Sequence, residues 1–264
     1  LKREDLQPVF SFKIRGAYNR IAQLSEEQKA KGVICASAGN HAQGVAYAAK
    51  LLGLQATIVM PTDAPSIKKE GTEKLGAAIR FYDRHSESRE DIAAEIAEST
   101  GAILIPAFDD EDIIAGQGTV GLELMQQLAD IDRVPDRVLS PCGGGGLLAG
   151  VSTAVKALHP PTQIYGVEPE NFDDPRRSKL AGERISIDGN SPTLCDALMA
   201  KTPGEITWSI NSEMVDDYLV VSEDDIAYAV SYAFRYLKLV VEPGGAAALP
   251  RPLSQTPSSA TAMP

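Results

Sequence analysis

Short apolar stretches alternate along this chain with longer segments in which apolar residues recur at helical spacing. The short stretches are rich in β-branched residues and predict buried strands, whereas the longer segments predict amphipathic helices. The predicted strands lie at 32–36, 56–60, 78–82, 103–105, 137–140, 163–167 and 218–221. The predicted helices lie at 40–52, 66–75, 88–100, 116–128, 147–158 and 222–239. This alternation predicts an α/β fold with parallel sheets that are covered by helices.

Three parts of the chain break the alternation: its start, one long middle segment and its end. Residues 1–34 predict a short strand, a loop at Pro8 and then a helix that follows Lys13. Residues 168–202 show no clear periodicity and predict an irregular segment. The end, 250–264, is rich in Pro, Ser, Thr and Ala and is predicted to be disordered.

The bulk composition narrows the class of protein. The 264 residues suffice for two modest domains or one large domain. No apolar run approaches the ~20 residues that a membrane helix needs, and a net charge of −11 argues against nonspecific nucleic-acid binding. Three widely spaced cysteines fit a reducing compartment better than a disulfide framework. We therefore expect a cytoplasmic protein with neither a nucleic-acid nor a membrane partner.

A lysine beside an aromatic ring opens the first predicted helix. Phe12 precedes Lys13, and Ser11 lies two positions before the lysine. Most lysines are solvated surface residues, and Lys13 alone would be interpreted in that way. A lysine amine can also form a Schiff base with a carbonyl cofactor. Two further segments, at 37–41 and 143–146, favour this second interpretation.

The first of these segments lies where a predicted strand gives way to a predicted helix. It consists of Ser37, Ala38, Gly39, Asn40 and His41. The first N–H groups of a helix have no partner within it, so such a loop can bind an anion. The structural alternative is an ordinary capped helix start, which is compatible with anion binding. His41 is interpreted as a packed residue rather than a catalytic base.

The second segment is a run of four glycines, Gly143 to Gly146, between a predicted strand and a predicted helix. Glycines cost backbone entropy, about 0.5–1 kcal/mol each relative to alanine in regular structure. Their presence indicates a backbone that wraps closely around a ligand, with N–H groups that would hold a phosphate. The spacing does not match the dinucleotide-binding motif G-x-G-x-x-G. A flexible linker is a poor alternative because apolar segments adjoin both sides.

An acidic segment follows the predicted strand at 163–167. It holds four carboxylates within seven residues, at Glu168, Glu170, Asp173 and Asp174. A solvated acidic loop is the common interpretation of such a segment. Oxygen-rich segments also suit hard divalent cations.

Taken together, these motifs resemble the serine/threonine dehydratase family of fold-type II pyridoxal-phosphate enzymes, from Leu1 to about Leu249. The resemblance rests on five ordered motifs, at 2–7, 11–16, 37–44, 143–146 and 242–246. It implies a larger α/β domain at 1–34 and 113–249 and a smaller one at 35–112, with the cofactor between them.

The resemblance also implies roles for individual residues. Lys13 would hold the cofactor as a Schiff base and later take the Cα proton of the substrate. Cofactor contacts would come from Phe12, Lys13, Asn40, Gly143, Gly144, Gly145, Gly146, Leu147, Gly204 and Glu242. The substrate carboxylate would bind Ser37, Ala38, Gly39, Asn40 and His41. A divalent cation (Mg²⁺, Mn²⁺ or Ca²⁺) would bind Glu168, the backbone carbonyl of Phe172, and Asp174.

The implied reaction is the dehydration and deamination of L-threonine or L-serine to a 2-oxo acid and ammonia. Two alternatives on the same scaffold are serine racemisation and dehydration of 3-hydroxyaspartate. Racemases of this kind carry a serine where this chain has Ala38, which favours the dehydratase. The full-length form is expected to be a homo-oligomer, a dimer or a tetramer.

A third alternative is a catalytically weak cofactor-binding fragment. The resembling family has more chain before Leu1 and after Leu249, and its C-terminal part carries a Ser, Thr or Cys that contacts the pyridine nitrogen. No counterpart is visible at 250–264. We therefore expect weak cofactor binding, slow turnover and reduced solubility for this chain.

Overall fold

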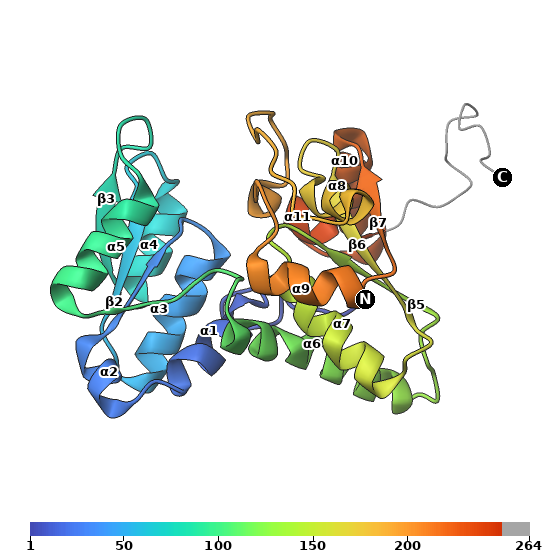
Figure 1. Cartoon of the computed structure of the whole chain (residues 1–264), viewed down its shortest axis with the longest axis horizontal. Coiled ribbons are helices and arrows are strands. Elements are labelled where there is room, and N and C mark those ends of the chain that lie inside the picture. Colours follow the sequence, from blue (N-terminus) through green and yellow to red (C-terminus); the bar gives the residue numbers. More distant parts are fainter. Residues whose placement is uncertain (250–264) are drawn as a thin grey trace. The chain divides into compact units, whose positions relative to one another are not determined.

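The structure is a computed structural model that describes residues 1–249; the tail at 250–264, predicted to be disordered, lies outside the described residues. It forms two compact units. Unit 1 contains Leu1–Pro135, Gly145–Thr162 and Gly204–Met214, and unit 2 contains Asp136–Gly144, Gln163–Pro203 and the chain from Val215. Each unit combines helices with one parallel sheet (Figure 1), which confirms the predicted α/β class. The domain limits predicted from the sequence stay a prediction.

The elements follow one another as strand and helix through most of the chain. The strands are β1 (Val33–Ala36), β2 (Ala56–Pro61), β3 (Ala78–Tyr82), β4 (Ile103–Leu104), β5 (Arg137–Pro141), β6 (Gln163–Pro169) and β7 (Asp217–Val221). The α-helices are α1 (Lys13–Ala22), α2 (Glu26–Lys31), α3 (Asn40–Leu52), α4 (Ser66–Lys74), α5 (Arg89–Thr100), α6 (Glu111–Ala129), α7 (Gly146–Leu158), α8 (Asp174–Ala181), α9 (Glu205–Met214), α10 (Glu223–Tyr232) and α11 (Pro243–Ala246). A 3₁₀ turn, η1 (Asp196–Leu198), and a π-helical turn, η2 (Ala233–Leu237), complete them. Every strand predicted from residue 32 onward is therefore present.

The structure corrects the prediction in the segments that lack periodicity. The described residues before α1 form turns and no strand, because hydrogen bonds such as Gln7 N to Glu4 O occupy the backbone groups that a strand would need. The segment predicted to be irregular contains α8 and η1, and the pattern does not predict α9. Helix α8 buries Pro175 and Ser178 instead of large apolar residues, so it leaves little apolar signal. The last predicted helix ends as α10 at Tyr232 and continues only as η2.

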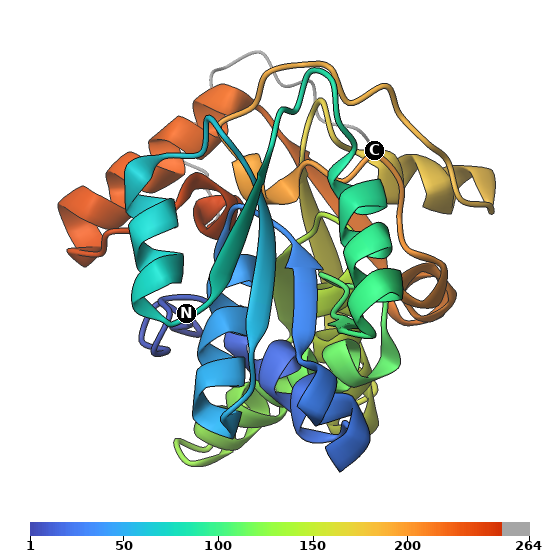
Figure 2. The same cartoon turned by 90° about the vertical axis from the view of Figure 1, so that its left-hand side faces the viewer.

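The sheet of unit 1 has the strand order β3-β2-β1-β4, and all its strands are parallel. Side chains alternate across the sheet. Val33 and Cys35 of β1 pack in one core with the alanine-rich face of α3, whereas Ile34 packs in another core with Ala93 of α5. Figure 2 shows the sheet standing between the blue helix α3 and the green helix α5. The loop that joins β1 to α3 carries the predicted anion-binding residues.

Glycines allow the helices of unit 1 to approach one another closely. A Cβ at Gly116 of α6 would lie 2.6 Å from the carbonyl oxygen of Arg15 on α1. A Cβ at Gly150 of α7 would lie 2.5 Å from the backbone nitrogen of Gly118 on α6. Only a residue without a side chain fits at these crossings. The glycines therefore allow α1, which begins with Lys13, to pack closely against α6, and α6 to pack closely against α7.

Unit 2 contains the parallel sheet β5-β6-β7. Strand β6 is the central strand, with Val138 of β5 opposite Ile164 and Leu219 of β7 opposite Val167. Helix α8 packs near β7 (Figure 1). The acidic segment therefore runs from the end of the central strand to the first residue of α8, Asp174.

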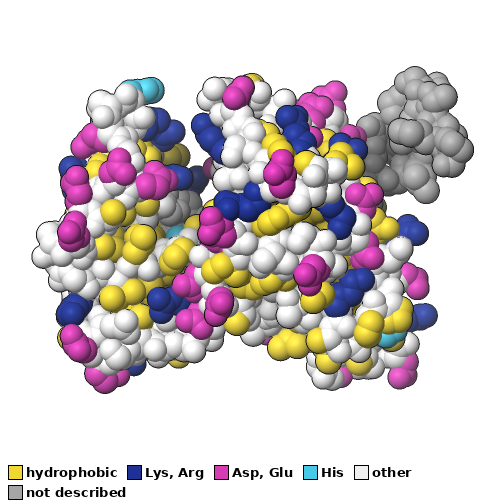
Figure 3. Space-filling view, viewed as in Figure 1, with side chains coloured by type: hydrophobic (Ala, Val, Ile, Leu, Met, Phe, Trp, Pro, Cys, Tyr) yellow, Lys and Arg dark blue, Asp and Glu magenta, His cyan; other side chains and the backbone are white. Residues whose placement is uncertain are grey.

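Charges of both signs are interspersed on the face shown in Figure 3. Acidic residues outnumber basic ones in the sequence, 36 to 25. Among the described residues, no helix is both long and apolar enough to cross a membrane.

Candidate functional site

Lys13 opens α1, and its side chain reaches the segment that follows β4. Its Nζ donates a hydrogen bond to the carbonyl oxygen of Ala107 over 2.7 Å and lies 5.3 Å from the centroid of the Phe12 ring. Its backbone N–H contacts the Oγ of the buried Ser11 at 3.4 Å. Lys13 is half-buried. The structure therefore anchors this amine inside unit 1 and does not leave it on a solvated helix end.

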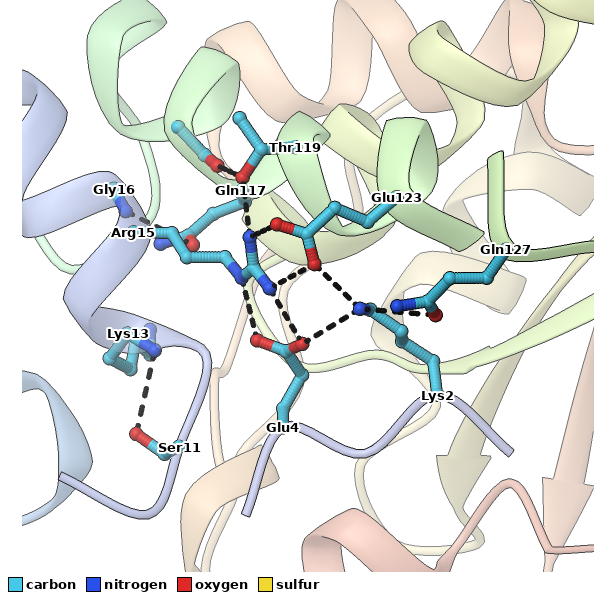
Figure 4. Close-up of polar contacts among 11 residues, drawn as sticks. Lys2, Glu4, Ser11, Lys13, Arg15, Gly16, Gln117, Thr119, Glu123 and Gln127 are labelled. Atoms are coloured by element: carbon cyan, nitrogen blue, oxygen red, sulfur yellow. Dashed lines mark hydrogen bonds and ion pairs between the residues drawn. The ribbon is translucent and has the colours of Figure 1, made fainter. Parts of the chain in front are cut away.

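A network of charges holds the helix that carries Lys13 (Figure 4). The guanidinium of Arg15 lies between the carboxylates of Glu4 and Glu123, at 2.7 Å from each. Lys2 binds the same Glu123 carboxylate at 2.6 Å. Hydrogen bonds from Arg15 and Lys2 lower the pKa of Glu123 to about 2. The network ties the first turn of α1 to α6, so the position of Lys13 is set by two independent contacts with α6, the charges and the glycines.

The loop 37–41 connects β1 to α3, and two hydrogen bonds of Ser37 hold the start of its backbone. The Ser37 N–H donates to the carbonyl oxygen of Val59, and the Ser37 hydroxyl accepts a hydrogen bond from the Gly39 N–H at 3.2 Å. Gly39 is the N-cap of α3, and a Cβ there would meet no atom within 4 Å. One turn further, a Cβ at Gly44 would lie 3.0 Å from the backbone carbon of Lys13. The predicted anion site is thus an open helix start that packs beside Lys13.

His41 belongs to the same loop, but its side chain serves the packing of unit 1. It is buried, and its Nε2 lies 2.9 Å from the carbonyl oxygen of Ile105. Because a carbonyl can only accept, Nε2 carries the hydrogen. Burial, and then the positive charge of Lys13, lower the pKa of His41 to about 3. His41 is therefore neutral near pH 7, in agreement with its interpretation as a packed residue.

This shift predicts a loss of stability in mild acid. Below the ordinary histidine pKa of 6.5 the unfolded chain takes up a proton that the folded chain refuses until about pH 3. The contribution of His41 to the free energy of unfolding should therefore fall as the pH drops through this window, by up to about 1.4 kcal/mol per pH unit. Urea unfolding at pH 7 and pH 5.5 should show a smaller difference for His41→Gln than for the wild type. Exposed His85, changed to Gln, is the matched control, and equal differences in wild type and His41→Gln would contradict the account.

The glycine run crosses from one unit to the other along the chain, with Gly143 and Gly144 in unit 2 and the residues from Gly145 in unit 1. Gly145 has a φ of +95°, which disfavours any other residue. A Cβ there would also lie 2.7 Å from Nδ2 of Asn211, which donates a hydrogen bond to the Gly145 carbonyl oxygen. A Cβ at Gly146 would lie 2.8 Å from Cβ of Phe108. The glycines at the start of α7 therefore permit close contact with α9 and with residue 108.

Asp109 is a residue that the sequence pattern does not single out. Its carboxylate accepts hydrogen bonds from the N–H groups of Glu205, Ile206 and Thr207, at 2.8–3.1 Å, and so caps the start of α9. Gly204 lies so close that a Cβ would clash with this carboxylate. The sequence carries one signal that could have drawn attention to Asp109. It adjoins Asp110, which is the N-cap of the next helix, α6. Gly204 thus lies in unit 1 against Asp109.

The remaining predicted cofactor residue belongs to unit 2. Glu242 is exposed and is the N-cap of α11, with Pro243 at the first helical position. Within unit 1 the structure brings together Lys13, the loop 37–41, the start of α7 at Gly145–Leu147 and Gly204. Their roles toward a ligand stay predictions.

Unit 1 fits the two reactive ends of pyridoxal phosphate. The amine of Lys13 bonds to Ala107, and the next residue, Phe108, lies against Gly146 where α7 begins. Ala107 therefore contacts the amine that would hold the aldehyde, and the next residue, Phe108, contacts the helix start that would hold the phosphate. The first N–H groups of α7 have no partner within the helix, and the positive end of the helix dipole favours a phosphate anion.

The predicted metal ligands of the acidic segment in unit 2 are buried, whereas a solvated acidic loop would expose them. Glu168, Phe172 and Asp174 are each at most 1% exposed, and one carboxylate oxygen of each acid, Glu168 Oε1 and Asp174 Oδ2, has no hydrogen-bond partner. Burial raises the pKa of both acids, that of Asp174 to about 7, and for Glu168 the charge of Asp174 adds to the effect. Each acid therefore keeps one buried oxygen without a partner, although the second oxygen of Glu168 accepts a hydrogen bond from the Arg176 N–H. Among the described residues, no three His, Cys, Asp or Glu side chains form a metal-binding group; the predicted set holds two carboxylates and a backbone carbonyl.

Comparisons with known proteins agree with this geometry. The sequence profile described as "Pyridoxal-phosphate dependent enzyme" matches residues 1–255. The chain is 44% identical over 246 residues to L-threonine ammonia-lyase of Thermotoga maritima, covering 93% of this chain and 60% of that enzyme. It is 42% identical to L-threo-3-hydroxyaspartate ammonia-lyase of a Pseudomonas species, over 93% of this chain and 75% of that enzyme.

A solved structure shows the same fold. The structure of maize serine racemase matches with a TM-score of 0.88 and 42% identity, covering 96% of this chain and 76% of that chain. The fold-type II assignment made from the sequence motifs is thereby confirmed. The relatives named here carry different activities at nearly equal identity, so identity alone does not separate their substrates.

Proposed function

We propose that this chain, which belongs to the pyridoxal-phosphate dependent enzymes in the group of the serine/threonine dehydratases, deaminates a small β-hydroxy amino acid. The substrate loses its β-hydroxyl as water, and hydrolysis of the resulting enamine gives a 2-oxo acid and ammonia. L-Threonine and L-serine are the proposed substrates. A cytoplasmic location and a homo-oligomeric state of the full-length protein remain predictions.

One observation carries the proposal: the contact of Lys13 with the segment that also supports the start of α7. The Lys13 Nζ lies 2.7 Å from the Ala107 carbonyl oxygen, and Phe108 lies against Gly146. The amine contacts residue 107, and the start of α7, whose first N–H groups have no partner within the helix, contacts residue 108. Such an arrangement suits a ligand with an aldehyde at one end and a phosphate at the other.

The residues of unit 1 divide the work of the reaction among them. Pyridoxal phosphate, when bound, supplies an electron sink for the bond pair that the Cα proton leaves behind. Lys13 would hold the cofactor, and its amine would take the proton from Cα of the substrate. The open helix start at Gly39 and Asn40 binds the substrate carboxylate and orients the Cα–H bond. The neutral His41 exchanges no proton and holds this loop to Ile105.

The loop also supports elimination over racemisation. Racemisation needs a proton donor on the face of Cα opposite the lysine, and the loop position proposed for that role carries the methyl group of Ala38. The test is incubation of the full chain and cofactor with L-serine, L-threonine and L-threo-3-hydroxyaspartate in turn. We expect 2-oxo acid from L-threonine or L-serine faster than from 3-hydroxyaspartate. D-Serine formation faster than 2-oxo acid formation would contradict the proposal.

We also propose that Glu168, the Phe172 carbonyl and Asp174 hold a divalent cation such as Mg²⁺, Mn²⁺ or Ca²⁺. The support is the pair of buried carboxylates with unpartnered oxygens at the end of β6 and the start of α8. Carboxylate and carbonyl oxygens are the ligands that these cations prefer. The role is structural, because the cation would fix the turn between β6 and α8 within unit 2.

Removal of this cation should lower the melting temperature. At a cation concentration a hundred times the dissociation constant, binding adds about 2.7 kcal/mol, which corresponds to roughly 5–10 °C for a chain of this size. Thermal unfolding with Mn²⁺ and with a chelator should show this difference in the wild type and lose it in Glu168→Gln. Exposed Glu170, changed to Gln, is the matched control from the same segment and should keep the difference. Equal melting temperatures with Mn²⁺ and chelator in the wild type would refute the cation.

A further inference from the structure

A buried phenol on β7 has a hydroxyl group with no partner. Tyr218 is 3% exposed, and within the described residues its hydroxyl oxygen is buried without a hydrogen-bond partner. An unpartnered buried hydroxyl is destabilising, and native structures contain few of them. None of the sequence motifs includes Tyr218. Its hydroxyl therefore indicates a group that normally meets it in the folded protein.

The register of the sheet places this hydroxyl on the side of the acidic segment. Tyr218 lies opposite Gly166, and Val220 lies opposite Glu168, in the parallel pair β6–β7. Paired residues and their second neighbours share one face of a sheet, so Tyr218 and Glu168 lie on the same face. Gly166 has no side chain, which leaves room for the phenol ring beside Glu168.

Unit 2 contains further buried oxygen atoms without hydrogen-bond partners. Glu168 Oε1 and Asp174 Oδ2 are buried and unpartnered in the same unit as the Tyr218 hydroxyl. The sheet register puts Tyr218 on the same face as Glu168. A phenol keeps its proton near pH 7, so the hydroxyl carries a hydrogen that it can donate. Two carboxylate oxygens and one hydroxyl that all lack partners are best explained by one common occupant.

We propose that the Tyr218 hydroxyl lies against the cation held by Glu168 and Asp174, and stabilises the bound cation by donating a hydrogen bond to an oxygen atom of its coordination shell. The inference rests on the proposed cation site and adds a positioning residue to it. Tyr218 contributes no charge, so it increases affinity by orienting an oxygen ligand. A hydrogen bond to a charged group makes such a contribution large enough to measure.

Tyrosine-sensitised Tb³⁺ luminescence tests this placement directly, because energy passes only from a ring that lies close to the bound ion. Tb³⁺ prefers oxygen ligands, as Ca²⁺ does. The full chain is titrated with Tb³⁺ as wild type, Tyr218→Phe, Tyr165→Phe and Glu168→Gln. Tyr165 is the matched control, since it is the neighbour of Gly166 on β6, points to the opposite face and already contacts Gln163 at 3.4 Å. Calorimetry with Mn²⁺ alone measures the affinity of each variant.

The expected result is bright emission in wild type and Tyr165→Phe, and weak emission in Tyr218→Phe and Glu168→Gln. Mn²⁺ should bind Tyr218→Phe about tenfold more weakly than wild type. Without a cation, Tyr218→Phe should melt no lower than wild type, because the change removes only an unpartnered oxygen and keeps the ring. If Tyr218 had a purely structural role, Tyr218→Phe would lower the stability of the cation-free protein. Weaker Mn²⁺ binding at unchanged cation-free stability therefore indicates a role at the cation.

Two outcomes would overturn the inference in different ways. If emission and Mn²⁺ affinity fall in Glu168→Gln but are unchanged in Tyr218→Phe, the cation site stands and the role of Tyr218 is refuted. If the wild type shows neither Tb³⁺ emission nor Mn²⁺ binding, the cation site itself is refuted, and the role of Tyr218 with it.

Discussion

Replacement of Lys13 by alanine should reduce the rate of 2-oxo acid formation by at least about a thousandfold. General base catalysis contributes typically 10²–10⁴ in rate, and this change also removes the only proposed covalent anchor of the cofactor. The Ala107 carbonyl loses the donor that lies 2.7 Å away in the wild type. That loss is worth about 1 kcal/mol of stability, so the variant should still fold. The measurement is the initial rate with L-threonine or L-serine at saturating cofactor.

Two control variants make this result specific. Lys13→Arg keeps a positive charge that can donate to Ala107 but provides no amine for the covalent anchor, so it should be as inactive as Lys13→Ala. Lys50→Ala removes an exposed lysine from the last turn of α3 and should keep the wild-type rate. A Lys13→Ala variant with more than a tenth of the wild-type rate would show that another group acts as the base.

The second large effect concerns stability. Gly150→Ala should lower the free energy of unfolding by about 3 kcal/mol or more, because the added methyl group would enter the contact between α7 and α6. Its carbon would lie 2.5 Å from the backbone nitrogen of Gly118, where neither helix backbone can give way cheaply. Urea unfolding at pH 7 measures the difference.

The matched control is Gly71→Ala, which adds the same methyl group to another helix. Gly71 lies within α4, where a Cβ would meet only the side chain of Gln43 at an ordinary 3.5 Å. Because alanine is the better helix former, this change should be neutral or stabilising by up to about 1 kcal/mol. Equal effects of the two substitutions would contradict the close packing of α6 and α7.

The elements with strong local signals are those that the sequence predicts well. Helix α3 has the predicted limits, and α5 ends at Gly101, which adopts the left-handed conformation expected of a helix-ending glycine. Helices α8 and α9 bury mainly small or polar residues, so hydrophobic periodicity does not reveal them. Helix α6 begins at Glu111, earlier than predicted, because the Asp110 cap and two acidic residues set its start.

The residues of the candidate site also differ in how well the sequence alone predicts them. Lys13, the loop 37–41 and the glycine run carry residue types whose chemistry is visible in the sequence alone. Asp109 and Asn211 become functional candidates only through contacts that the fold creates, since the first caps α9 and the second binds the carbonyl oxygen of Gly145. Pattern analysis has no access to such contacts, which join residues far apart in the chain.

The central claim is that Lys13 anchors the cofactor, and borohydride trapping tests it most directly. The full chain is mixed with pyridoxal phosphate, reduced with borohydride, digested and mapped by mass spectrometry. The account predicts that the reduced cofactor is found on the peptide that contains Lys13 and that Lys13→Arg removes this adduct. A reduced cofactor on a different lysine, or a wild-type chain without any adduct, would contradict it.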